Sequence, residues 1–163
     1  TQLTLSSNPV KAAAVAVPLC AVSMPVVINA DVNNGPGQWQ ESVDSVTFNN
    51  ITDNANFSGT QSYSLQLQNI PSAWYGRKYR CVAGGINSTV FTIYFVNKWL
   101  STGTVNWEDA ANWSCGKLPD VNTDVVINSG TVVLNSDVTV RSLKLANGVN
   151  FTVSPGYKLT ILE

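Results

Sequence analysis

The chain contains no histidine, and only 12% of its 163 residues are charged. The absence of histidine excludes Ser-His-Asp and Cys-His arrangements, and with them most nucleophilic hydrolases. Nine basic residues against ten acidic residues give no electrostatic footprint for nucleic acid or for an anionic membrane surface. We therefore expect no nucleic-acid partner. No run of about 18 apolar residues is present, so we also expect no membrane span.

The sequence also lacks any long stretch with the apolar spacing i, i+3, i+4 that is typical of an amphipathic helix. Val, Thr, Asn and Ser are abundant instead, and Gly and Pro recur throughout. These features predict an all-β chain. Its length exceeds the roughly 100 residues of one seven-stranded sandwich but is short for two full domains. We therefore expect a complete sandwich over residues 1–97 and a small β-domain over residues 98–163.

Residues 65–81 place alternating apolar residues, a turn, a tyrosine and a cysteine in the order of an immunoglobulin-type corner. Tyr79 stands two residues before Cys81. In the immunoglobulin fold this tyrosine returns its hydroxyl to backbone upstream, and the cysteine faces a core tryptophan on strand C. Trp39 is the candidate for that tryptophan. The alternative is an unrelated antiparallel hairpin with a chance Tyr-x-Cys.

Three cysteines, Cys20, Cys81 and Cys115, allow one disulfide and leave one thiol over. If the first domain is an extracellular sandwich, Cys20 and Cys81 are the natural pair across its two sheets, and Cys115 is free. Cys20 lies ahead of the expected strand B at residues 24–28, which leaves open that this bridge lies near the end of the sandwich or is absent. Three widely separated cysteines without histidine do not form a zinc site, so no metal or cofactor is expected.

The second part of the chain begins with a segment rich in Trp, Asn and Gly, followed by short apolar runs. Turn signals separate these runs, at Ser129-Gly130, Asn147-Gly148 and Pro155-Gly156. The expected strands are 125–127, 132–134, 138–140, 143–145, 151–153 and 159–161. Such regular short strands fit either a β-meander or the first coils of a β-solenoid, in which each coil needs stacked neighbours. We expect this part to pack on the sandwich and to begin a longer array, as a fragment of a larger protein.

Two segments carry a resemblance to a known group of proteins. Residues 38–81, which include Trp39 and Tyr79-Arg-Cys81, resemble immunoglobulin-like modules of large secreted and cell-surface proteins of Bacteroidetes. Residues 99–127, with Trp107-Glu-Asp-Ala-Ala-Asn-Trp113, are similar to a segment that follows such modules in gliding and adhesion proteins. The resemblance spans about residues 20–163 and implies an exported, multidomain, surface-attached architecture, with adhesion or glycan contact as its usual role.

Exposed aromatic side chains are the candidate binding residues, because flat apolar faces with a polar handle suit sugar rings. The candidates are Trp74, Tyr75, Trp107 and Trp113. The favoured interpretation of Trp107 and Trp113 is structural, since aromatic burial is the largest apolar gain available to a small domain.

Carboxylates offer the remaining route to catalysis or to metal binding. The pairs Glu41 with Asp44, Glu108 with Asp109, and Asp120 with Asp124 have no spacing that places them across a cleft, as glycosidase chemistry requires. No catalytic residue is therefore assigned. Asp120, Asn122 and Asp124 form an oxygen-rich segment that fits either Ca²⁺ or a turn that caps itself, and we favour the turn.

A secretion signal is rejected for Lys11 and the apolar run up to Cys20, because Pro18 interrupts the run and Leu3, Leu5 and Val10 already alternate like a strand. The sequence predicts a non-enzymatic module that is secreted or lies on the cell surface and serves adhesion to a protein or glycan. Its neighbours would be other domains of a larger chain. The alternatives are a carbohydrate-binding accessory module of a secreted hydrolase and a purely structural spacer.

Overall fold

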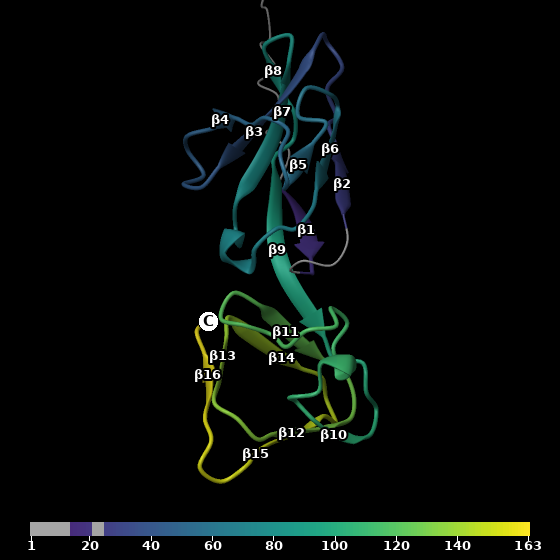
Figure 1. Cartoon of the computed structure of the whole chain (residues 1–163), viewed down its shortest axis with the longest axis vertical. Coiled ribbons are helices and arrows are strands. Elements are labelled where there is room, and N and C mark those ends of the chain that lie inside the picture. Colours follow the sequence, from purple (N-terminus) through teal and green to yellow (C-terminus); the bar gives the residue numbers. More distant parts are fainter. Residues whose placement is uncertain (1–13, 21–24) are drawn as a thin grey trace, which may run out of the picture.

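The computed structural model describes residues 14–20 and 25–163, and within them the chain is all-β (Figure 1). Two short 3₁₀ helices, η1 (Ser72–Trp74) and η2 (Ala110–Asn112), occur among the strands. The alternating residues Leu3, Leu5 and Val10 lie outside the described residues. No helix in the described part of the chain is long and apolar enough to cross a membrane.

Two sheets form a sandwich in the first part of the chain. One sheet contains β1 (Val15–Leu19), β9 (Phe91–Lys98), β7 (Lys78–Ala83), β3 (Gly37–Ser42) and β4 (Asn49–Asn50), with β8 (Ile86–Asn87) paired to β7. The other contains β2 (Val26–Asn29), β6 (Ser64–Leu67) and β5 (Phe57–Ser58). All these pairs are antiparallel except β1 with β9. This is the strand arrangement of an immunoglobulin-like sandwich.

The sandwich core is built around the residues that the corner motif singled out. Trp39 on β3 lies opposite Cys81 on β7, and both are fully buried. Tyr79 is also fully buried, but its hydroxyl faces the carboxylate of Glu41 on the neighbouring strand at 3.5 Å. The expected return of this hydroxyl to upstream backbone is therefore wrong. Gly76 makes the turn before β7 with φ of 82°, a conformation that favours glycine.

The second part is a β-solenoid and not a meander, because its strands pair in parallel. β10 (Thr104–Asn106) pairs with β12 (Thr131–Leu134), which pairs with β15 (Asn150–Val153). β11 (Asp124–Ile127) pairs with β14 (Ser142–Leu145), and β13 (Val138–Val140) pairs with β16 (Leu159–Ile161). We call β11–β13 the second coil and β14–β16 the third coil; the first coil runs from the end of β9 through β10. The coils have the three-sided outline visible in Figure 1.

Alternation along each solenoid strand explains the interior of the coils. Val125, Ile127, Val132 and Leu134 point inward and are fully buried, while their chain neighbours are partly exposed. Three tryptophans complete this core, Trp99, Trp107 and Trp113. The solenoid therefore has a hydrophobic core separate from that of the sandwich.

Strand β9 belongs to both parts of the molecule. Its residues Phe91–Phe95 pair with β1 in the sandwich, and Val96–Lys98 pair with β11 in the solenoid. Figure 1 shows this strand passing from one part into the other. The expected boundary at residue 97 thus falls inside a continuous strand and not in a flexible linker.

Candidate functional site: the junction of sandwich and solenoid

The junction surrounds the middle of β9, where its pairing partners change. In the sandwich, β9 has β1 along one edge and β7 along the other, since Phe91 pairs with both Val15 and Tyr79. The chain that follows β1 and the chain that precedes β7 therefore flank β9 on opposite sides as it enters the solenoid. Each flank carries contacts to the second part of the molecule.

On the β1 side the contact is covalent. Cys20 follows β1 directly and forms a disulfide with Cys115, with their Cα atoms 5.3 Å apart. Cys115 also lies against β9, because its backbone N–H donates to the side-chain oxygen of Asn97 at 3.2 Å. The expected pairing of Cys20 with Cys81 is wrong, and Cys115 is not free. The reason is positional: Cys81 sits in the sandwich core beside Trp39, whereas Cys20 lies at the end of the sandwich that faces the solenoid.

Cys81 is the cysteine without a disulfide partner. Its backbone N–H donates to the Ser88 hydroxyl at 2.9 Å. Burial raises the pKa of its thiol, which keeps it protonated and unreactive.

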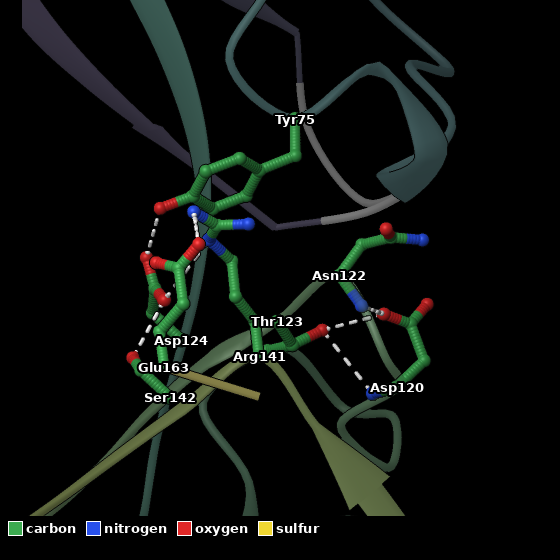
Figure 2. Close-up of polar contacts among 8 residues, drawn as sticks. All are labelled: Tyr75, Asp120, Asn122, Thr123, Asp124, Arg141, Ser142 and Glu163. Atoms are coloured by element: carbon green, nitrogen blue, oxygen red, sulfur yellow. Dashed lines mark hydrogen bonds and ion pairs between the residues drawn. The ribbon is translucent and has the colours of Figure 1, made fainter. Parts of the chain in front are cut away.

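On the β7 side Tyr75 makes the central polar contact. Its hydroxyl donates to the carboxylate of Asp124, the first residue of β11, at 2.6 Å (Figure 2). Asp124 is held from the other side by the Ser142 hydroxyl, which donates to it at 2.6 Å. The Arg141 guanidinium stacks on the Tyr75 ring, 4.0 Å from its centre, and pairs with Glu163 at 2.5 Å. Burial and the bond to Asp124 raise the pKa of Tyr75 to about 12, so the phenol stays neutral and keeps donating.

A second hydrogen bond lies beside the first. The Ser72 hydroxyl, in η1, donates to Asp120 at 2.6 Å. The other carboxylate oxygen of Asp120 accepts from the Asn122 N–H and from the Thr123 hydroxyl, both at 2.9 Å, as Figure 2 shows for these residues. The segment is thus a turn that caps itself, the alternative that we favoured over a Ca²⁺ loop. No group of three or more Cys, Asp or Glu suited to a metal ion occurs within residues 14–20 and 25–163.

A shallow cleft of about 260 Å³ opens at the junction near the disulfide. Its lining comes from both parts of the molecule and includes Leu19, Pro71, Phe95, Leu118 and Asp120. Ligand pockets are typically about 300–1,000 Å³. The cleft falls below this range, and the charged residues in its lining are Lys117 and Asp120.

The aromatic residues expected to bind sugars occupy other positions. Trp107 and Trp113 are fully buried, with ring centres 4.6 Å apart, and the Trp113 indole N–H donates to the Trp107 carbonyl at 2.9 Å. The structural interpretation of Trp107 and Trp113 is therefore confirmed and their assignment as binding residues is wrong, because together with Trp99 they fill the core of the first coil. Tyr75 is engaged by Asp124 and Arg141, as described above.

Trp74 is half-buried at the end of η1. It packs against Phe57 in the sandwich core, with ring centres 5.7 Å apart, and the Arg77 guanidinium lies 4.0 Å over its ring. Both contacts reduce the face that Trp74 offers to solvent. The sequence singled out the Trp74-Tyr75 pair but did not predict that Tyr75 contacts the solenoid; the acidic residues Asp120 and Asp124 were the available signal.

Each carboxylate pair considered for catalysis is occupied by contacts within the fold. Glu41 pairs with Arg77 at 3.2 Å, and Asp44 accepts from the backbone N–H groups of Val46 and Thr47. These backbone bonds hold the pKa of Asp44 well below its usual range. The carboxylate therefore remains ionised at neutral pH and organises the loop in which it lies.

Glu108 and Asp109 are likewise tied to neighbouring backbone. Burial acts to raise the pKa of Glu108, but hydrogen bonds from the Asn135 N–H and the Ser136 hydroxyl outweigh it and lower that pKa. Asp109 caps η2 by accepting from the Ala111 N–H at 3.0 Å. Both carboxylates are therefore occupied by hydrogen bonds within the solenoid.

Searches with this chain matched no protein-family model, no curated protein and no solved structure.

Proposed function

We propose that this chain is a non-catalytic module of an extracellular surface protein, in which the junction holds an immunoglobulin-like sandwich in a fixed direction on the first coil of a β-solenoid. The observation that carries the proposal is the three-point attachment: strand β9 is shared, a disulfide lies on one side of it, and two side-chain hydrogen bonds lie on the other. Such a module positions neighbouring domains and transmits force between them.

The three attachments act on different motions. Bending toward the β1 side or away from it changes the Tyr75–Asp124 and Cys20–Cys115 separations in opposite senses, because the two contacts flank β9. Twisting about β9 breaks its ladder with β11. A flexible linker would leave these motions free, and inter-domain motion is the usual expectation unless contacts restrict it.

The Cys20–Cys115 disulfide supports an extracellular setting. Disulfides form and persist mainly in oxidising compartments. The resemblance to immunoglobulin-like modules of Bacteroidetes surface proteins supports the same assignment. A carbohydrate platform is less well supported, since two of its four candidate residues are core tryptophans and a third is engaged at the junction.

Adhesion to a protein is a second candidate function, and one feature of the sandwich favours it. The loop between β3 and β4 projects two apolar side chains, Val43 and Val46, which are 70% and 83% exposed. Asp44 fixes the loop through its bonds to the Ser42 hydroxyl and to backbone N–H groups. A rigid loop that presents apolar side chains is suited to a small protein contact.

The fixed direction of the two parts is tested by ¹⁵N relaxation of the oxidised chain. We expect the sandwich and the solenoid to report one common rotational diffusion tensor. In a variant with Cys20→Ser, Cys115→Ser and Tyr75→Phe, the two parts should give distinct tensors. Tyr63→Phe is the matched control, because it removes a phenol that bonds to the Gly35 carbonyl within the sandwich. Independent tumbling in the oxidised native chain would contradict the proposal.

A further inference from the structure

The third coil differs from the second in its backbone pairing. In the second coil, β11 pairs with β9 and β14, and β12 pairs with β10 and β15, whereas β13 pairs, among the described residues, with β16 alone. In the described part of the chain, each strand of the third coil has a single partner, in the second coil. The outer edges of β14, β15 and β16 are therefore three unpaired strand edges, a feature that natural proteins normally cover or protect.

Side chains at matching register positions show the same difference. Ile127, Leu134 and Val140 in the second coil are fully buried. Their Cα partners in the third coil are Leu145, Val153 and Ile161, which are 42%, 36% and 45% exposed. The inward apolar pattern is thus repeated in the third coil without a layer that buries it.

The opposite end of the solenoid does not have this exposed layer. There Trp99, Trp107 and Trp113 pack on one another and on the inward residues of the second coil. Solenoids require ends that are capped, because each coil buries its face only against its neighbours. One end of this solenoid meets that requirement and the third coil does not.

The backbone after β16 shows the direction that a further layer would take. The Glu163 N–H donates to the Arg141 carbonyl at 2.9 Å, and the Leu162 N–H donates to the Val140 carbonyl at 3.2 Å. This pattern extends the parallel ladder around the corner toward the start of β14 at Ser142. Glu163 thereby lies beside the edge at which a new strand would begin to pair with β14.

From these observations we infer that the exposed face of the third coil is a docking surface for a further β-solenoid coil that continues from Glu163 in parallel register. The interface would repeat the one between the second and third coils. A single strand satisfies only one of the three edges, whereas a three-sided coil meets all three edges and covers Leu145, Val153 and Ile161 together.

The test appends a second copy of residues 143–163 directly after Glu163 of the full chain. The first residue of the copy, a leucine, then lies beside Leu143. All three new strands have the same register shift relative to β14, β15 and β16. The control appends the same segment with its inward residues, Leu143, Leu145, Phe151, Val153, Leu159 and Ile161, changed to Asn or Ser in the copy only. Hydrogen exchange of the β14, β15 and β16 amides is then measured in both proteins.

We expect exchange at these edge amides to slow by at least about tenfold with the native copy and to stay unchanged with the polar copy. Equal exchange in both proteins would overturn the inference. Sedimentation of the unmodified chain over a micromolar concentration series provides a second readout, with Val153→Lys as its matched variant. A monomer is expected; a dimer that Val153→Lys abolishes would make a second copy the occupant and would also overturn the inference.

Discussion

Tyr75 connects the two parts of the molecule through both its hydroxyl group and its ring. Its position next to Trp74 in an immunoglobulin-type corner suggested an exposed anchor for a partner, but the hydroxyl is taken by Asp124 and the ring by Arg141. The pKa of the phenol rises from 10.0 to about 12, first through burial and then through its bond to the Asp124 carboxylate. A group whose folded pKa is raised stabilises the fold below its unfolded pKa and loses that contribution as the pH rises through the folded pKa.

We therefore predict a specific alkaline dependence for Tyr75→Phe. Below pH 10 the native chain should be more stable than the variant by about 1 kcal/mol, the typical net contribution of an intramolecular hydrogen bond. The difference should disappear as the pH rises from about 10 to 12. Denaturant unfolding across this range measures it. A pH-independent difference between the native chain and Tyr75→Phe would contradict the assignment.

Single residues also mark where sequence reasoning succeeded and where it failed. Trp39, Tyr79 and Cys81 could be placed in the sandwich because period-2 alternation and the Tyr-x-Cys spacing are local signals. The disulfide partner of Cys20 was not predicted. The pairing depends on how residues 113–115 fold back along β9, and Cys115 is 95 residues away from Cys20 in the sequence. Nothing in the spacing of three cysteines distinguishes that pairing from the one expected across the two sheets.

At the level of elements, the solenoid strands were the most predictable feature and their pairing was the least. All six expected runs between residues 124 and 161 are strands, because apolar alternation bounded by Gly-containing turns determines which residues face inward. Alternation does not determine which strand pairs with which. Parallel pairing of β11 with β14 results from stacking whole coils, so the choice between meander and solenoid stayed open in the sequence.

The tryptophan cluster is predicted to hold the first coil together. Trp113→Ala should destabilise the chain by about 3–5 kcal/mol, because it leaves a cavity and removes the indole N–H bond to Trp107. Trp74→Ala is the matched comparison, since that ring is half-buried and should cost distinctly less. Chemical denaturation followed by tryptophan fluorescence measures both. Equal small losses for the two variants would place Trp113 outside the core.

For the whole molecule, the disulfide determines whether sandwich and solenoid behave as one unit. The two cysteines are 95 residues apart in sequence, and closing a loop of this length stabilises by about 4–5 kcal/mol in the chain-entropy model. We expect the oxidised chain to unfold in one transition.

The variant Cys20→Ser with Cys115→Ser should unfold in two transitions, because each part keeps its own core. Calorimetry distinguishes the two cases. Cys81→Ser tests for a general effect of removing a thiol and should lower the midpoint without splitting the transition. A single transition in the double variant would mean that β9 and the polar contacts alone couple the two parts.

The central claim is that the sandwich and the solenoid keep a fixed relative direction. Pulsed electron paramagnetic resonance, which measures the distance between two spin labels, tests it most directly. Unnatural amino acids at Val46 and Tyr157, both exposed and one in each part, carry the labels without involving cysteine. The account predicts one narrow distance distribution for the oxidised chain, which broadens on reduction of the Cys20–Cys115 bond. A broad distribution in the oxidised chain would contradict it.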